Sequence, residues 1–176
     1  MKTKGTLAIA ALCLVLGVTA SAQKVSVDWD KSTNFSAFKT YVYALGTPVQ
    51  NQLMDQRIVS GIEQQLTLKG LQKVEATANP DLIVSYQAAM GSQTQVNTTG
   101  TGGYGWGARW GGGMSTTTVN TIPTGMLAVN IGDAKTHKLL WLGDARDTLS
   151  DNPEKNTKKV NKALEKMFKK YPPPAK

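Results

Sequence analysis

"GMLAVNIGDAKTHKLLWLGDARDTL", residues 125–149, carries the clearest structural pattern in this 176-residue chain. Leu127, Val129 and Ile131 alternate with the residues between them, as in a strand that buries one face. "DAKTHK", residues 133–138, has the composition of a turn, and "LLWLGDA" then returns as a second apolar segment. The stretch therefore predicts a β-hairpin.

Two segments have the periodicity of helices. Within residues 51–69, Ile58, Ile62 and Leu66 are four apart, and Gly70 follows as a glycine suited to end a helix. A second helix is predicted from Pro153 to about Lys170. Rotation by 100° per residue places its apolar residues on one face: Val160, Ala163, Leu164, Met167, Phe168 and Tyr171. The other face gathers lysines: Lys155, Lys158, Lys159, Lys162, Lys166, Lys169 and Lys170.

Shorter strands are predicted at 25–29, 40–45, 82–86 and 115–122 from alternation and from β-branched or aromatic content. A strand, a helix and another strand in that order suggest one β-α-β crossover. The class is therefore α+β: a largely antiparallel sheet with two helices packed on one face. Residues 91–115, rich in Gly, Thr and aromatic residues, are predicted to form a flexible loop inserted in this domain.

Residues 1–22 have the build of a secretory signal peptide. Lys2 and Lys4 precede an uncharged apolar run, and small residues lead to a cleavage site between Ala22 and Gln23. The run is shorter than the about 20 residues of a confident membrane span, so an uncleaved anchor is the less favoured alternative. Cleavage leaves a single domain, residues 23–176, without a transmembrane segment, and lowers the net charge from +8 to +6.

Cys13 raises the question of whether the exported protein is anchored by a lipid. It lies inside the apolar run and follows Leu12, whereas lipidation requires a small residue before the cysteine. The prediction is therefore an exported protein of the periplasm, or one associated with the outer membrane, that is not lipid-anchored. The mature chain has no cysteine, so it must be stabilised by its core alone.

Several segments together resemble the bacterial family called domain of unknown function 4136. They are "NFSAFKTYVY", "RIVSGIEQQLTLKGL", "NPDLIVSY", "GMLAVNIGDAKTHKLLWLGDA" and "MFKKYPP", in this order. The resemblance covers nearly all of the mature chain, and its most specific part runs from Gly125 to Gly143. It implies an exported envelope protein. Many members look like lipoproteins, and this chain departs from them because it lacks a usable lipidation cysteine. The resemblance supplies no activity, ligand or catalytic residue.

The stretch "GTGGYGWGARWGGGM", residues 100–114, raises the question of a phosphate site. Gly100, Gly102 and Gly105 match G-x-G-x-x-G, but no strand leads directly into the motif and no helical pattern follows it. Nucleic-acid binding is also disfavoured, because the protein is predicted to be exported and the stretch has one charged residue. If the loop has a role, we expect contact through its large side chains: Tyr104, Trp106, Arg109 and Trp110.

The remaining candidates for chemistry are sparse. His137 is the only histidine and lies in the predicted turn, without the partners that a metal site or a Ser-His-Asp set requires. Asp144, Asp147 and Asp151, with Arg146 among them, lack calcium-loop spacing and suit the exposed end of a strand. We therefore predict no catalytic residue, metal or cofactor.

Three functions follow from these patterns. The first is a non-enzymatic binding or structural component of the periplasm, with an unknown envelope protein or an anionic envelope surface as partner. The second is a peripheral membrane protein that uses the lysines of the last helix, Lys155, Lys158, Lys159, Lys162, Lys166 and Lys169. The third is an enzyme acting on an envelope polymer or lipid through Asp144, Asp147 or His137.

Overall fold

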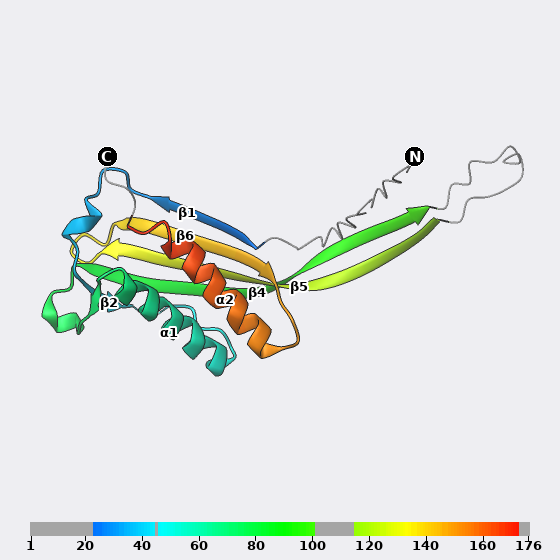
Figure 1. Cartoon of the computed structure of the whole chain (residues 1–176), viewed down its shortest axis with the longest axis horizontal. Helices are drawn as coiled ribbons and strands as arrows, with labels where there is room; N and C mark the ends of the chain where they lie inside the picture. Colours follow the sequence, from blue (N-terminus) through cyan, green and yellow to red (C-terminus); the bar gives the residue numbers. More distant parts are fainter. Residues whose placement is uncertain (1–22, 45, 101–114, 173–176) are drawn as a thin grey trace, which may run out of the picture.

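A computed structural model describes residues 23–44, 46–100 and 115–172. A sheet lies behind two helices, and one hairpin extends well beyond the rest of the molecule (Figure 1). The elements are β1 (Lys24–Trp29), β2 (Thr40–Tyr43), α1 (Gln52–Leu68), β3 (Gln72–Lys73), β4 (Leu82–Gly100), β5 (Ser115–Asp133), β6 (Leu139–Thr148) and α2 (Pro153–Phe168), with short 3₁₀ turns at Phe35–Ala37 and Ala76–Ala78. The predicted signal peptide and the predicted contact residues Tyr104, Trp106, Arg109 and Trp110 lie outside the described residues.

The sheet has six strands in the order β1-β6-β5-β4-β2-β3. The β1–β6, β6–β5 and β5–β4 pairs are antiparallel. By contrast, β2 pairs in parallel with both β3 and β4. The sheet is therefore mixed, and the prediction of a largely antiparallel sheet is corrected. The parallel pairs arise because the chain returns through α1 after β2, as in the predicted β-α-β crossover. The sequence missed β3, which is only 2 residues long.

The long hairpin β4–β5 also corrects the predicted loop. Each strand has 19 residues, and the register runs unbroken from Leu82↔Asp133 to Gly100↔Ser115. Residues 91–100 and Ser115 are therefore strand, although they were predicted to belong to the loop; residues 101–114 are outside the described residues. The sequence suggested two separate strands on either side of Pro123, but the structure has one continuous strand, β5. A proline is accepted at an edge position, where its missing N–H costs no ladder hydrogen bond.

Both helices begin at a capping asparagine, and α1 ends at a glycine cap. The Asn51 side chain accepts a hydrogen bond from the Met54 N–H (3.1 Å) at the start of α1. Gly70 follows α1 with φ of +80°, and the Leu71 N–H donates to the Leu66 carbonyl (3.1 Å), as the glycine cap predicted. Asn152 caps α2, where its side chain accepts from the N–H groups of Glu154 and Lys155 at 2.8 and 3.2 Å.

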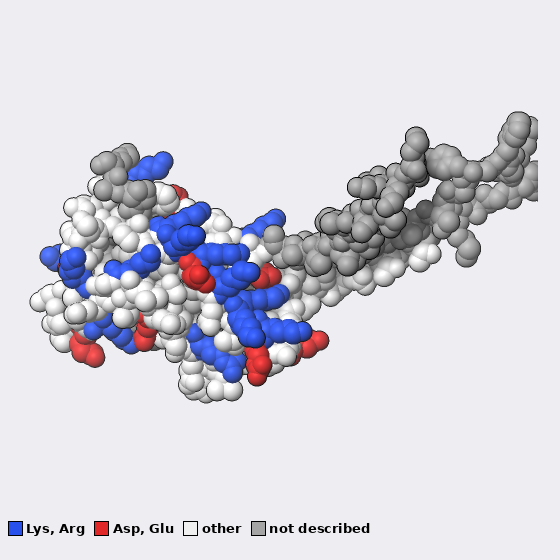
Figure 2. All heavy atoms as spheres, viewed as in Figure 1, with Lys and Arg blue, Asp and Glu red and all other residues white. Residues whose placement is uncertain are grey.

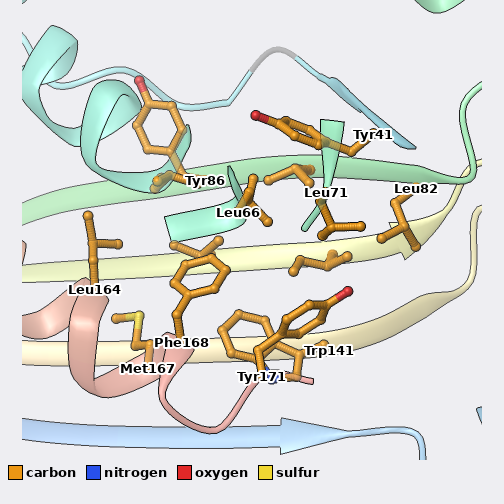
Figure 3. Packing of buried hydrophobic residues seen from close by; sticks show 14 of the residues in the cluster. Tyr41, Leu66, Leu71, Leu82, Tyr86, Trp141, Leu164, Met167, Phe168 and Tyr171 are labelled. Atoms are coloured by element: carbon orange, nitrogen blue, oxygen red, sulfur yellow. The ribbon is translucent and has the colours of Figure 1, made fainter. Parts of the chain in front are cut away.

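The core lies between the sheet and the two helices (Figure 3). Trp141 of β6 is fully buried, with its ring centroid 5.3 Å from that of Phe168 and 5.6 Å from that of Tyr171. Gly143 leaves room for this indole, because a Cβ there would lie 2.6 Å from Cη2 of Trp141 and 3.1 Å from Sδ of Met167. The W-x-G spacing is thus a packing requirement.

Candidate apolar binding pocket at the base of the hairpin

An apolar pocket opens where the β4–β5 hairpin leaves the body of the protein. Its volume is about 100 Å³, and it lies between the sheet and the N-terminal halves of α1 and α2. The sheet contributes Ala88, Met90, Gly125 and Leu127 to its wall. The helices contribute Met54, Ile58, Val160 and Ala163.

Small side chains create this space and methionines line its mouth. Ala88, Ala145 and Ala163 lie where larger residues would fill the volume. Met90 lies on the same face of the sheet as Ala88 and is 64% exposed, so the apolar surface continues outwards from the pocket. Methionine is unbranched and flexible, and such side chains adapt to apolar partners of different shape. The arrangement suits the burial of an apolar group.

A carboxylate holds α1 against β4 on one side of the pocket. Oδ1 of Asp55 accepts hydrogen bonds from the Val49 N–H (3.2 Å) and from the Tyr86 hydroxyl. Burial, reinforced by this hydrogen bond to Asp55, raises the pKa of Tyr86 well above its ordinary value. The phenol therefore remains a hydrogen-bond donor at neutral pH and ties β4 to the first turn of α1.

A polar cluster closes the opposite side. Lys159 Nζ donates to the Thr148 carbonyl at 2.6 Å, to the Thr148 hydroxyl at 3.0 Å and to Asp147 Oδ1 at 3.3 Å. The Gln23 amide donates to the Lys159 carbonyl at 2.9 Å and to Asp147 Oδ2 at 3.3 Å. Lys159 is therefore half-buried and already bonded, unlike the freely solvated lysine that the sequence predicted on the anion-binding face.

The other predicted lysines do form a basic surface. Figure 2 shows lysine and arginine side chains gathered over α2. The exposed ones from the predicted set are Lys155, Lys158, Lys162, Lys166 and Lys169. The apolar face of the same helix is used in the core, since Leu164, Met167 and Phe168 are 0% exposed. No helix in the described ranges is both long enough and apolar enough to cross a membrane.

The residues considered for catalysis do not come together. His137 lies before the start of β6 at φ of 57°, whereas Asp147 is next to the last residue of that strand. Asp144 and Asp147 face opposite sides of β6, because side chains alternate along a strand. Asp151 lies in the connection to α2. Among the residues that the structure describes, no group of three His, Cys, Asp or Glu could hold a metal ion.

A family model matches the chain over residues 25–173, and its description is "Domain of unknown function (DUF4136)". The chain belongs to the DUF4136 family. The match covers almost all of the described part, from β1 to the residues after α2. The resemblance seen in the sequence is thus confirmed. A search of curated proteins found no match to this DUF4136 chain.

Two solved structures share the fold of this DUF4136 chain. A DUF4136 family protein from Bacteroides thetaiotaomicron is 14% identical, with a TM-score of 0.55 over 85% of this chain and 96% of its own. A PDZ domain protein from Parabacteroides distasonis is 21% identical, with a TM-score of 0.55 over 86% of this chain. This chain spans only 35% of that protein. At these identities the likeness concerns the fold alone.

The sequence did not reveal the pocket, although it contained partial signals. The apolar faces of both helices were recognised, but Met54, Met90 and Leu127 fall on three different elements. These side chains come together only because of where the two helices pack along the sheet, which is a feature of the tertiary structure. The one local signal is Gly125, which leaves space for Leu149 at the pocket: a Cβ there would lie 2.9 Å from Cδ2 of Leu149.

Proposed function

We propose that this protein is an exported, non-enzymatic binding component of the bacterial envelope, and that the pocket at the hairpin base receives one apolar side chain of a partner protein. The observation that carries the proposal is the apolar pocket of about 100 Å³ with its exposed methionine rim. The signal-peptide pattern of residues 1–22 supports export, and a periplasmic location follows from it.

The size of the pocket favours a side chain over a free ligand. Sites for drug-sized small molecules usually have about 300–1,000 Å³, whereas a dry cavity of about 150 Å³ takes a group as small as benzene. A volume of about 100 Å³ therefore suits one aliphatic or aromatic group. In protein interfaces, such an anchored side chain commonly contributes a large part of the binding free energy.

The proposal is tested by filling the pocket. Ala88→Leu places an apolar side chain inside it, whereas Ala128→Leu, on the opposite face of the sheet, is the matched control. A photo-reactive residue in place of Met90 reports contact at the rim, and one in place of Leu139, which is 51% exposed, reports background.

We expect Met90 to give a defined adduct in intact cells that Ala88→Leu abolishes and Ala128→Leu retains. An adduct that persists in Ala88→Leu, or one that forms equally from Leu139, contradicts the proposal. Both leucine variants are first checked by thermal unfolding, so that loss of the adduct is not loss of the fold.

The basic surface of α2 supports a second candidate, weak attachment to an anionic membrane. Since the apolar face of the helix is buried in the core, the contact rests on the exposed lysines alone. Such attraction is screened by salt. Sedimentation with anionic and neutral liposomes tests it: binding to anionic liposomes that disappears at high salt supports this candidate, and equal, negligible binding to both kinds excludes it.

A further inference from the structure

The outer half of the β4–β5 hairpin, residues 91–100 and 115–123, is a ribbon of only two strands. β6 stays beside β5 only as far as Thr148↔Thr124, and β2 leaves β4 after Tyr43↔Val84, with one further bridge at Thr47↔Gln87. In the described part of the chain no third strand accompanies the ribbon beyond that point. The ribbon projects from the body of the protein (Figure 1). At about 3.4 Å per residue, its length is about 30 Å.

Both edges of this ribbon expose backbone groups that can pair with another strand. A hairpin of two strands is marginally stable in water, and proteins usually protect such edges with charged residues, prolines or bulges. Residues 91–100 and 115–123 contain no charged residue, and Pro123 is their only proline. The β4–β5 ladder runs in continuous register without a bulge. The outer half thus lacks the features that prevent edge pairing.

The hydrogen bonds at the base show which groups point outwards. The Thr47 N–H donates to the Tyr86 carbonyl, and the Leu149 N–H donates to the Pro123 carbonyl. The backbone N–H and C=O groups of successive residues in an antiparallel strand point to opposite sides. Counting from Tyr86 and Pro123, those of every second residue therefore point to the free edge. On β4 the free edge therefore presents the N–H and C=O groups of Ser92, Thr94, Val96 and Thr98. On β5 it presents those of Thr117, Val119 and Thr121.

The sequence of the ribbon is complementary to itself. "QVNTT", residues 95–99 of β4, and "TVNTI", residues 118–122 of β5, share the order Val-Asn-Thr. Their pairing brings like residues together, with Val96 opposite Val119 and Thr98 opposite Thr117, whose hydroxyl oxygens are 3.5 Å apart. Such Thr–Thr and aliphatic cross-strand pairs are favourable. A strand of this composition therefore accepts another strand of the same composition as its neighbour.

We propose that the β4 edge pairs antiparallel with the β4 edge of a second copy of this chain, about a two-fold axis near Val96. The result is a four-stranded sheet in which Thr94 of each copy lies opposite Thr98 of the other. The β4 edge is favoured over the β5 edge because it is free beyond the Thr47↔Gln87 bridge, from Met90 outwards, and contains no proline there. The β5 edge instead begins at Pro123, whose carbonyl already accepts the Leu149 N–H. In this antiparallel dimer, the positively charged bodies of the two copies lie at opposite ends of the four-stranded sheet, so they do not face each other.

Two matched proline variants test this pairing. Thr94 and Thr121 face each other in the ribbon, and both N–H groups point to a free edge, so neither proline removes a hydrogen bond of the hairpin. Thr94→Pro removes an edge donor of β4 and Thr121→Pro one of β5. In sedimentation velocity of the purified protein at micromolar to submillimolar concentration, we expect the unaltered protein and Thr121→Pro to dimerise. We expect Thr94→Pro to remain monomeric over the same range.

Amide hydrogen exchange of the unaltered protein provides a readout that needs no variant. Dimerisation is expected to slow the exchange of the Thr94, Val96 and Thr98 amides by at least about tenfold as concentration rises, without the same effect at Thr117, Val119 and Thr121. The proposal is overturned if the unaltered protein stays monomeric or if Thr94→Pro still dimerises. Loss of dimers in Thr121→Pro alone, or concentration-dependent protection of the β5 edge instead, also overturns it.

Discussion

The inner and outer halves of the β4–β5 hairpin share one continuous register but have opposite surroundings. In the inner half, Val84, Val129 and Ile131 are 0% exposed beneath the two helices. In the outer half, Val96 and Val119 are each 60% exposed. Strand conformation thus extends well past the point where the core ends. β-branched residues and cross-strand pairs maintain the ribbon, but only the inner half contributes to burial.

The largest expected difference between the halves comes from removing a side chain on β5. Ile131→Ala opens a cavity in the core and should lower the free energy of unfolding by about 2–4 kcal/mol. Val119→Ala, on the same strand, should lower it by less than about 0.5 kcal/mol, since that side chain is already exposed. Urea unfolding measures both. Equal losses would mean that the outer half is buried in solution.

A glycine comparison probes packing in the same way. Gly143→Ala forces the Trp141 indole and Met167 to move, and we expect a loss of about 1–3 kcal/mol in the free energy of unfolding. Gly91→Ala, at the start of the outer half, meets only the Thr124 hydroxyl oxygen at 3.4 Å. It should be neutral or slightly stabilising, because alanine restricts the unfolded chain more than glycine. Thermal unfolding of the two variants provides the comparison.

Acid should destabilise the body of the protein through Asp81, the residue directly before β4. Its carboxylate accepts hydrogen bonds from the N–H groups of Lys39 (2.8 Å) and Thr40 (3.0 Å), which lower its pKa below the ordinary 3.8. The stabilisation is therefore complete above pH 3.8 and is lost as pH falls through the lower pKa of the folded state. Asp81→Asn should flatten this part of the stability profile, as measured by urea unfolding at a series of pH values. An unchanged profile would rule out this role for Asp81.

Removing the whole outer half is also expected to have only a small effect on stability. Residues 92–123 are replaced by Asn-Gly, which joins Gly91 to Thr124, two residues that face each other in register. The core residues remain, so the free energy of unfolding should change by less than about 1 kcal/mol. Circular dichroism and urea unfolding check the fold. Unfolding of this variant would show that the body depends on the ribbon.

Local patterns predicted most of the elements but not all of their ends. The hairpin over 125–149 and the helix from Pro153 were recognised because alternation and helical period are carried by neighbouring residues. The strand nature of 91–100 was missed, since threonine, glutamine and glycine on both faces give no alternation of apolar and polar residues. The site was predicted still less well. The pocket combines residues from both helices and three strands, and no local pattern specifies their meeting.

The sequence by itself determined the family, the faces of the two helices and the glycine cap at Gly70, because each is encoded in residues that are close together in the chain. Only the tertiary structure decided that β2 lies in parallel between β3 and β4, and that Lys159 bonds to Asp147 and Thr148. It also placed the pocket at the point where the hairpin leaves the body. These features depend on contacts between residues far apart in the chain, which periodicity and composition do not encode.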